Sequence, residues 1–270
     1  MAKKVRGRHR PHLWCRAVDC GQPLAESLRQ LAPRPRATRR LDPACLLAPV
    51  PAVLVATARA AREEEGRRVF EGANLATFAW AGIINSKPPR LSISVRPERH
   101  TWSLLEETGE FSVNLVSEDL LAAADFCGLR SGRDMDKFQV CGLHAVAAAE
   151  LDTAPRLAEA PLSLSCRIFQ TQVLGSHILC LADILAVEAA EDLFDAGGQL
   201  HLDWAQLVSY EHGMYRRQSQ NLGFFGYSLA KPDLLKRRLG DRYPKRQAKA
   251  VSRPGRPRSG TGGRRPKGSG

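Results

Sequence analysis

The chain of 270 residues has no apolar run of about 18 residues, so it predicts no membrane-spanning helix. Its basic N-terminus is not followed by an apolar segment, so we expect no secretory signal. The seven cysteines are scattered and odd in number, which is typical of a reducing compartment rather than of a disulfide framework. We therefore expect a cytoplasmic protein without membrane association.

Four signatures of common enzyme classes are also missing from the sequence. There is no G-x-G-x-x-G after a strand, no G-x-x-x-x-G-K-[ST], no H-E-x-x-H and no G-x-S-x-G. These absences argue against a dinucleotide held in a Rossmann crevice, ATP chemistry, zincin chemistry and a hydrolase elbow.

The net charge of +12 is distributed unevenly along the chain. Residues 1–40 carry 11 Lys and Arg against 2 Asp and Glu, and residues 231–270 carry 14 against 2, whereas residues 41–230 carry 15 against 24. The sequence therefore predicts an acidic globular domain at 41–230 between two basic flanks.

The two flanks give weaker signals. Residues 231–270 are rich in Gly, Pro, Ser and Arg, which predicts a disordered tail whose charge could make weak contact with nucleic acid. Residues 1–40 are expected to be an irregular extension with one short helix at 24–32. Its four possible zinc ligands lie too close together to favour a tetrahedral site, and these are His9, His12, Cys15 and Cys20.

The central domain alternates strand patterns with short helix patterns. Strands are expected at 51–58, 74–82, 90–95, 111–116, 162–169 and 177–190. One helix is expected from Thr101, as N-cap, to a stop at Gly109, and a second from the cap Ser117 to Gly128. Residues 62–68 are expected to form an exposed turn, and Pro88 and Pro89 break the strand pattern. Together these predict a mainly β fold with short helices, built as an antiparallel barrel.

One stretch combines small residues with a cationic helix start. The strand "ANLATFAWAG" allows a flat ligand to approach the backbone closely, because most of its side chains are small. Arg96, Arg99, His100 and Thr101 follow at a helix N-terminus, where free N–H groups favour a phosphate. Ser86 and Lys87, in the preceding turn, are expected to reach the same phosphate.

An ordered series of motifs over residues 41–230 resembles the flavin reductase-like proteins, close to the flavoredoxin branch. The matching segments are "NLAT-AW", "SKPP", "SISVRP-RHT", "TGEFSVNL", "FCG--SGRD-DKF", "LGSHILCLADI" and "YEHGMY". The resemblance implies an FMN-binding split β-barrel that forms a homodimer, with one FMN per subunit near the dimer interface. One departure is the stretch at 58–74, which looks longer than the usual short hairpin.

The resemblance also implies roles for individual residues. The flavin ring and ribityl chain would be lined by Asn74, Ala76, Thr77, Phe78, Ala79 and Trp80. The ribityl chain and phosphate would be held by Asn85, Ser86, Lys87, Arg96, His100 and Thr101. His177 would lie where nicotinamide stacks, as the catalytic position, and residues 134–138 would form a bordering loop. NADH or NADPH would donate hydride directly to the flavin, which demands no acid–base pair.

Three functions remain open on the sequence alone. The first is an FMN-dependent oxidoreductase that uses a nicotinamide donor and passes electrons to flavin, a partner monooxygenase or another acceptor. The second is an FMN electron-transfer protein reduced by a partner protein. The third is a split-barrel module recruited to a polyanion by its basic flanks.

Plainer structural roles are also open for single residues. Trp80, Cys127 and Cys166 can be core residues, and His177 can be a structural hairpin histidine. Residues 210–217 can form a terminal helix that packs on the barrel.

Overall fold

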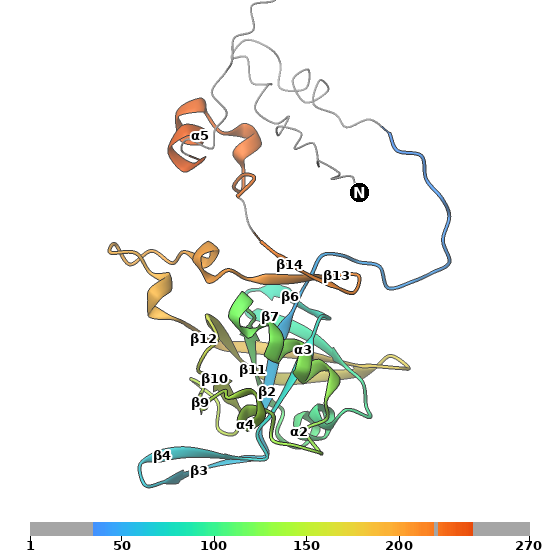
Figure 1. Ribbon diagram of the computed structural model, residues 1–270, viewed down its shortest axis with the longest axis vertical. Coiled ribbons are helices and arrows are strands. Elements are labelled where there is room, and N and C mark those ends of the chain that lie inside the picture. The colour runs from blue at the N-terminus through green and yellow to red at the C-terminus, as the bar shows by residue number, and fades with distance from the viewer. Residues whose placement is uncertain (1–34, 219–220, 240–270) are drawn as a thin grey trace, which may run out of the picture. The chain divides into compact units, whose positions relative to one another are not determined.

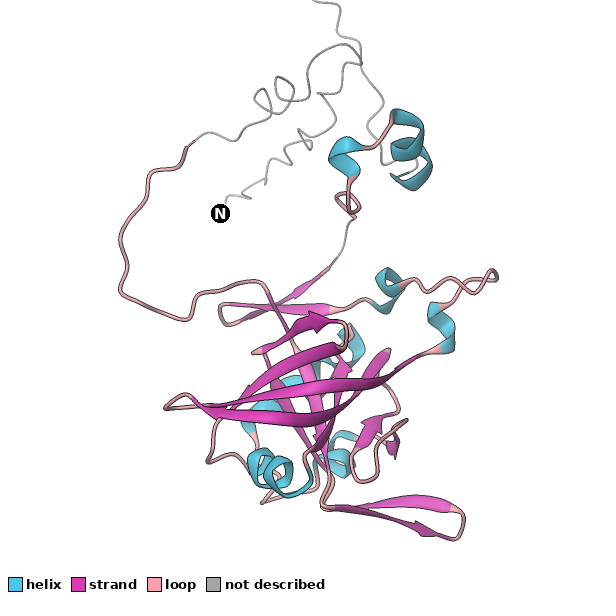
Figure 2. Ribbon diagram, turned by 180° about the vertical axis from the view of Figure 1, so that it is seen from behind, coloured by secondary structure: helices cyan, strands magenta, loops and turns pink. Residues whose placement is uncertain are grey.

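The computed structural model describes residues 35–218 and 221–239 (Figures 1 and 2). The central compact unit covers residues 41–220 and so ends before the expected boundary at residue 230. The expected helix at 24–32, the cluster of His9, His12, Cys15 and Cys20, and the tail from residue 240 lie outside the described residues. Within the other unit, η5 (Tyr227–Leu229) and α5 (Pro232–Leu239) are helical. The expectation of disorder from residue 231 is therefore wrong for Pro232–Leu239.

Seven antiparallel strands form the main sheet, in the order β5-β2-β8-β11-β12-β7-β6. Their bounds are β2 (Val53–Thr57), β5 (Asn74–Phe78), β6 (Ala81–Ser86), β7 (Pro89–Val95), β8 (Glu110–Leu115), β11 (Leu162–Val173) and β12 (Ile178–Ala189). The expected mainly β architecture is confirmed, because each of the six strand patterns forms a strand of this sheet.

The sheet closes into a barrel through a two-residue link. β5 and β6 are the two edge strands of the sheet, yet only Ala79 and Trp80 separate them in the chain. Phe78 and Ala81 are three residues apart in the chain, which span at most about 11 Å, so the two edges must lie next to each other. The Trp80 carbonyl also accepts a hydrogen bond of 3.0 Å from the Ser94 amide of β7. Trp80 is thereby placed at the seam of the barrel.

The core lies on both faces of the sheet. β2 is buried along its whole length, and its residues alternate between two apolar clusters as strand geometry requires. Val53 and Val55 pack with Phe111 inside the barrel, whereas Leu54 and Ala56 pack outside it, against the helices. A strand buried on both faces explains why this segment is a continuous apolar run rather than an alternating one.

Two further segments form hairpins: the stretch at 62–68, whose expected exposed turn lies at Glu65 and Gly66, and residues 210–217, for which a helix was one alternative. The charged stretch at 62–68 belongs to β3 (Ala60–Glu64) and β4 (Arg67–Glu71), an arm that projects from the barrel (Figure 1). Residues 210–217 lie in β13 (Val208–Glu211) and β14 (Met214–Arg217). The turn between these two strands has positive φ at His212 (46°) and Gly213 (86°), which suits a tight hairpin turn.

The remaining short strands support the barrel at its margins. β1 (Val50–Pro51) pairs with β13, and β9 (Ala145–Ala147) pairs with β10 (Pro155–Leu157).

The helices connect the strands, and their starts differ from expectation. α2 (His100–Thr108) begins one residue before Thr101, with Arg99 at the N-cap and no side-chain cap hydrogen bond. Ser117 precedes the 3₁₀ turn η2 (Glu118–Leu120) and the helix α3 (Leu121–Leu129), also without a side-chain cap bond. α4 (Lys137–Cys141), η3 (Glu191–Leu193) and η4 (Leu202–Ala205) complete the set. None of the described helices has the length and apolar character that crossing a bilayer requires.

The five cysteines within the described residues are all free thiols. Cys127 and Cys166 are buried, and burial raises the pKa of each thiol to about 12. Both are therefore core cysteines, as one alternative from the sequence held.

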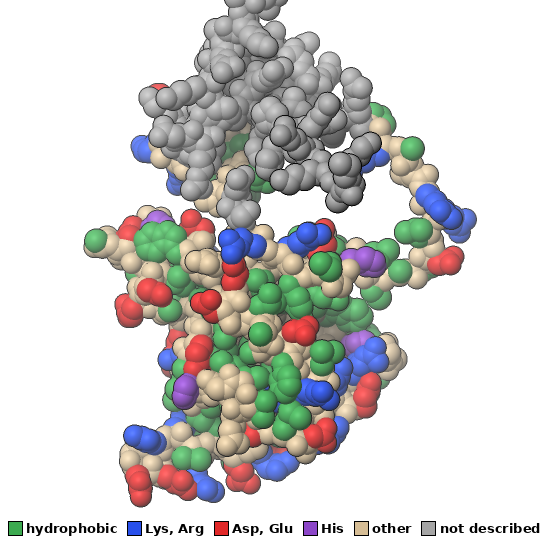
Figure 3. All heavy atoms as spheres, viewed as in Figure 1, with side chains coloured by type: hydrophobic (Ala, Val, Ile, Leu, Met, Phe, Trp, Pro, Cys, Tyr) green, Lys and Arg blue, Asp and Glu red, His purple; other side chains and the backbone are tan. Residues whose placement is uncertain are grey.

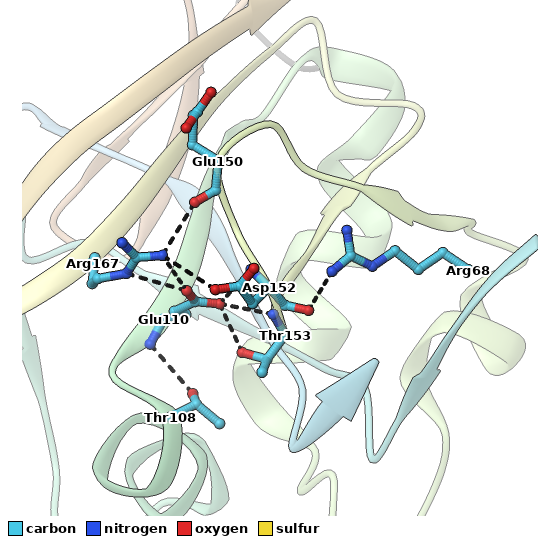
Figure 4. A network of polar contacts seen from close by, with 7 residues as sticks. All are labelled: Arg68, Thr108, Glu110, Glu150, Asp152, Thr153 and Arg167. Carbon is cyan, nitrogen blue, oxygen red and sulfur yellow. Dashed lines mark hydrogen bonds and ion pairs between the residues drawn. The ribbon is translucent and has the colours of Figure 1, made fainter. Parts of the chain in front are cut away.

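A buried glutamate anchors the start of β8 (Figure 4). Glu110 is 4% exposed and accepts hydrogen bonds from the Arg167 guanidinium (2.7 Å), the Thr153 amide (2.8 Å) and the Asp152 amide (2.9 Å). Burial acts to raise the pKa of this carboxyl, but the donors outweigh it, so the pKa of Glu110 lies below 4.5. The ionised carboxylate thus joins β8 and β11 to the loop that precedes β10.

Replacing Glu110 with Gln should lower the free energy of unfolding at pH 7 by about 2–3 kcal/mol, because Arg167 loses its anion and the buried donors lose an acceptor. The folded pKa is depressed, so the contribution is fully present above the unfolded pKa of 4.5 and declines as the pH falls through the folded pKa. Urea unfolding at pH 7 and pH 3.5 should show a smaller loss of stability on acidification in Glu110→Gln than in wild type. An equal acid loss in both proteins would contradict this assignment, and Glu64→Gln, on the exposed arm, is the control.

Candidate functional site

A cavity of about 480 Å³ opens on the central unit where the barrel seam meets α2 and the segment after α3. One wall is β5 with the Ala79–Trp80 link. The opposite wall is the start of α2 and residues 128–133, and Lys137 and His177 complete the lining. The cavity has a predominantly apolar end at Trp80 and a cationic end at α2.

A buried asparagine with an unused acceptor lies between these walls. Asn74, at the start of β5, is 2% exposed, and its Nδ2 donates to Thr101 Oγ1 at 3.1 Å. Its Oδ1 is buried and has no partner among the described residues. A buried amide oxygen without a donor costs free energy, so it indicates a missing group with an O–H or N–H. If the amide is flipped, Thr101 donates instead and the NH₂ group is the unused one.

Gly132 allows the chain to approach this asparagine closely. A Cβ at position 132 would lie 2.1 Å from Asn74 Oδ1 and 3.0 Å from His100 Cδ2. No side chain fits at that distance, so only glycine is compatible with the observed position of the segment. The close approach brings the backbone of residues 130–133 against the α2 start and shapes the cationic end of the cavity.

The cationic end holds several positive groups and little negative charge. Arg96, Arg99, Arg130, Arg133 and Lys137 line the cavity, and Glu98 is the one acidic residue among the described residues that do so. The first turn of α2 contains no acidic residue, and its leading amides have no side-chain cap. Dipole, free amides and side chains therefore all favour an anion at this point.

Lys137 is the most buried of these cations. It is 3% exposed, and its Nζ donates to the Leu75 carbonyl at 2.6 Å and to the Cys127 carbonyl at 3.0 Å. Burial lowers its pKa, and the nearby Arg99 lowers it further. An ammonium has three protons, and only two are used here, so one remains for a ligand.

The pKa of His100 is lowered by the same kinds of interaction as that of Lys137. Burial lowers the pKa of His100, and the charges of Arg133, Arg59 and Lys137 add to that effect. A bound anion would relieve the mutual repulsion of these groups.

The other end of the cavity is flat and aromatic. Trp80 is 47% exposed and lies beside His177, with ring centroids 4.7 Å apart and planes tilted by 36°. His177 occupies the turn between β11 and β12, where its carbonyl accepts from Leu174 N (2.8 Å) and its Nδ1 lies 2.9 Å from Ser176 Oγ. The small residues Ala76 and Ala79 leave the β5 backbone accessible from this end.

Most of the residues that the sequence singled out meet in this cavity. Those that line it are Asn74, Ala76, Thr77, Phe78, Ala79, Trp80, Arg96, His100, Thr101 and His177. Thr101 is present as a buried partner of Asn74 rather than as a helix cap. The segment expected as a bordering loop at 134–138 is a loop only to Asp136, which caps α4 by accepting from Gln139 N at 3.1 Å.

Asn85, Ser86 and Lys87 do not line this cavity within one chain. They lie at the exposed tip of the β6–β7 hairpin, where Asn85 Nδ2 donates to the Pro88 carbonyl at 2.8 Å and so closes the turn. The tip is five residues along β6 from Ala81, or roughly 17 Å at about 3.4 Å per residue. The expectation that these three residues share a phosphate with His100 is wrong for a single copy.

Sequence reasoning also missed several residues that line the cavity. They include Ser94, Glu98, Arg130, Ser131, Gly132 and Arg133, whereas Lys137 belongs to the expected bordering loop. The motif "FCG--SGRD-DKF" was the available signal, because it contains Gly132, Arg133 and Lys137.

Comparison with known proteins places these features in context. A family model described as the flavin reductase like domain matches residues 47–218. An uncharacterized protein of Aeropyrum pernix is 31% identical over 133 residues, which is 49% of this chain and 49% of that protein. The structure of flavoredoxin from Desulfovibrio vulgaris (Miyazaki F) is 25% identical, with a TM-score of 0.60 over 70% of this chain and 97% of that one. The FMN-binding protein of Thermus thermophilus with bound 1-cyclohex-2-enone is 23% identical, with a TM-score of 0.54 over 72% and 99% of the two chains.

Proposed function

The chain belongs to the flavin reductase-like family and has its split-barrel fold, and from that premise we propose that it is an FMN-binding oxidoreductase reduced by NADH or NADPH. The observation that carries the proposal is the buried, unpartnered Asn74 Oδ1 between an aromatic end and a cationic end of one cavity. A flavin mononucleotide has a flat ring, a chain of hydroxyls and a phosphate in the same order.

The residues present fit that cofactor at each of its three parts. The phosphate would be held by Lys137, His100, Thr101 and Arg133 at the α2 start. A ribityl hydroxyl would supply the donor that Asn74 Oδ1 lacks. The ring would lie along Ala76–Trp80, where small side chains expose backbone amides. Bound FMN would supply the two-electron acceptor for a hydride from reduced nicotinamide.

The chain's own contribution is to position the donor and shield the ring. Trp80 and His177 form an aromatic rim at the ring end, and we propose His177 as the catalytic position that contacts the nicotinamide. The hydroxyl of Ser176 lies 2.9 Å from Nδ1 of this imidazole and orients it. Direct hydride transfer needs alignment of donor and acceptor rather than a general acid or base.

We also propose that the protein is a homodimer. Large apolar side chains are exposed on the sheet, including Ile83 (68% exposed) on β6 and Val173 (75%) on β11. On the face drawn in Figure 3, hydrophobic side chains are exposed across the middle of the central unit. A second copy of the chain would remove such surface from water. Light scattering should then give twice the 29.7 kDa of one chain, and a monomer at micromolar concentration would refute the dimer.

A comparison of FMN with riboflavin tests the cofactor assignment. Flavin-free protein should bind one FMN per chain, at least about a hundredfold more tightly than riboflavin, because riboflavin lacks the phosphate that the cationic end would bind. Quenching of flavin fluorescence measures both affinities. Equal affinities for FMN and riboflavin would show that the cationic end does not bind the phosphate. If neither flavin binds, the proposed function is wrong.

A further inference from the structure

The cationic end of the cavity carries more positive charge than one phosphate requires. Five arginine and lysine side chains line the cavity, and Glu98 is the one acidic residue among the described lining residues. A phosphate monoester carries close to two negative charges at pH 7 and accepts a limited number of hydrogen bonds. About two positive charges are therefore left over when FMN is bound.

Burial separates Lys137 from the four arginines, all of which are exposed. Lys137 is 3% exposed and lies with Asn74 and Thr101 at the bottom of the cavity. Arg99 and Arg130 are exposed at its mouth. A phosphate held by Lys137 and the buried start of α2 leaves these two outer arginines available to another group.

The outer arginines also differ from their neighbours in what they contact. Arg96 pairs with the Glu98 carboxylate at 3.5 Å, and Arg133 donates to the Glu98 carbonyl at 2.9 Å. Arg99 and Arg130 make no ion pair or side-chain hydrogen bond with the residues that the structure describes. Arg99 nevertheless lies close enough to Lys137 to lower its pKa.

The two arginines belong to two segments that both line the cavity. Arg99 is the N-cap residue of α2, and Arg130 follows the last residue of α3. The bond from Arg133 to the Glu98 carbonyl ties these two segments together across the mouth. Both arginines line the cavity, and each guanidinium can bind a phosphate in a fork.

We propose that Arg99 and Arg130 form a second phosphate subsite that binds the 2′-phosphate of the donor, so that the protein prefers NADPH to NADH. This inference rests on the proposed function, because it assumes that FMN occupies the inner part of the cavity. The donor's nicotinamide would lie at the Trp80 end and its adenosine phosphate at the mouth. A monoester at the 2′ position matches the charge that FMN leaves uncompensated.

The test is calorimetric binding of 2′,5′-ADP and 5′-AMP to the FMN-loaded, full-length protein at low salt. We expect 2′,5′-ADP to bind at least about tenfold more tightly, since each charge-assisted contact contributes roughly a factor of ten. Arg99→Ala and Arg130→Ala should each remove most of that preference, measured on protein saturated with FMN. Arg130→Lys should retain part of it, because the charge remains, and the exposed Arg62→Ala on the β3–β4 arm should change nothing. The ratio of kcat/KM for NADPH over NADH should fall in parallel.

Two results would overturn the subsite. One is equal binding of the two adenosine nucleotides by wild type. The other is a loss of 5′-AMP binding as large as that of 2′,5′-ADP in the arginine variants, which would mean that the arginines read the 5′-phosphate or pyrophosphate instead. Failure of the proposed function can be distinguished from failure of the subsite before this test. In that case the protein would not retain FMN, or neither dinucleotide would reduce the bound FMN. Thermal unfolding of each variant within about 2 °C of wild type confirms that the exposed substitutions leave the fold intact.

Discussion

Replacing Gly132 with alanine should weaken FMN binding by at least about a hundredfold while leaving the barrel folded. The added Cβ would lie 2.1 Å from Asn74 Oδ1 and 2.9 Å from its Cγ, and Asn74 is buried with little room to move. Residues 130–133 must therefore move outward, which separates Arg133 and the segment's backbone from the α2 start. The loss of two charge-assisted contacts corresponds to roughly 3 kcal/mol. Flavin fluorescence titration measures the affinity, and circular dichroism checks the fold.

Gly82→Ala is the matched control for this substitution. Gly82 lies in β6, its φ is outside the left-handed region, and a Cβ there would meet nothing within 4 Å. It should bind FMN as wild type does. Wild-type affinity in Gly132→Ala would show that the segment near Asn74 does not contact the cofactor.

Replacing Lys137 with methionine should lower both stability and FMN affinity. The buried Nζ donates to the carbonyls of Leu75 and Cys127, so it joins β5 to α3 from its position at the start of α4. Methionine fills similar space but leaves both carbonyls with one donor fewer, at a cost of about 2–4 kcal/mol. For a domain of this size we expect the Tm to fall by about 5–15 °C. FMN affinity should fall by a further tenfold or more, because the remaining ammonium proton no longer reaches the phosphate.

Lys87→Met is the matched control, because Lys87 is exposed whereas Lys137 is buried. Lys87 lies at the exposed tip of the β6–β7 hairpin and should tolerate methionine without a change in Tm. If Lys137→Met unfolds at the wild-type temperature and binds FMN normally, Lys137 is neither an anchor nor a phosphate ligand. A drop in Tm without a drop in affinity would leave only its structural role.

Local patterns were enough to predict the barrel strands but not the partners of each charged residue. Residues 53–57 and 162–169 carry period-two or continuous apolar signals that depend only on near neighbours, and both form strands. The resemblance implied that Asn85, Ser86 and Lys87 hold the ribityl chain and phosphate. The hairpin carries Ser86 roughly 17 Å along β6 from Ala81, because its register is set by pairing with β7.

Lys137 was expected only as part of the bordering loop at 134–138, and its burial was not predicted. Its sequence distance from Asn74 hides the fact that α3 and α4 fold back onto β5 and bury its side chain. Lysine is rarely buried, so the residue type gives no signal for this position. Gly132 is similar, because its importance lies in a contact with a residue 58 positions earlier in the chain. Such contacts are set by tertiary packing and leave no periodic signal.

The two hairpins had usable signals. Residues 62–68 contain Glu65 and Gly66, both with positive φ, and these form the exposed turn that the sequence predicts between two strands. Residues 210–217 place His212 and Gly213 between Tyr210 and Tyr215, whose rings pack edge to face at 5.5 Å. In this second stretch the central glycine favours a tight turn over the helix that was one alternative.

The anaerobic visible spectrum of the FMN-loaded protein, before and after addition of NADPH and then NADH, tests the central claim most directly. We predict that binding to the protein shifts the visible absorption band of FMN and that this band bleaches within seconds of adding the dinucleotide. Bleaching should require a lower concentration of NADPH than of NADH. A bound flavin that stays oxidised with both dinucleotides would contradict the oxidoreductase assignment and favour an electron-transfer protein that a partner reduces.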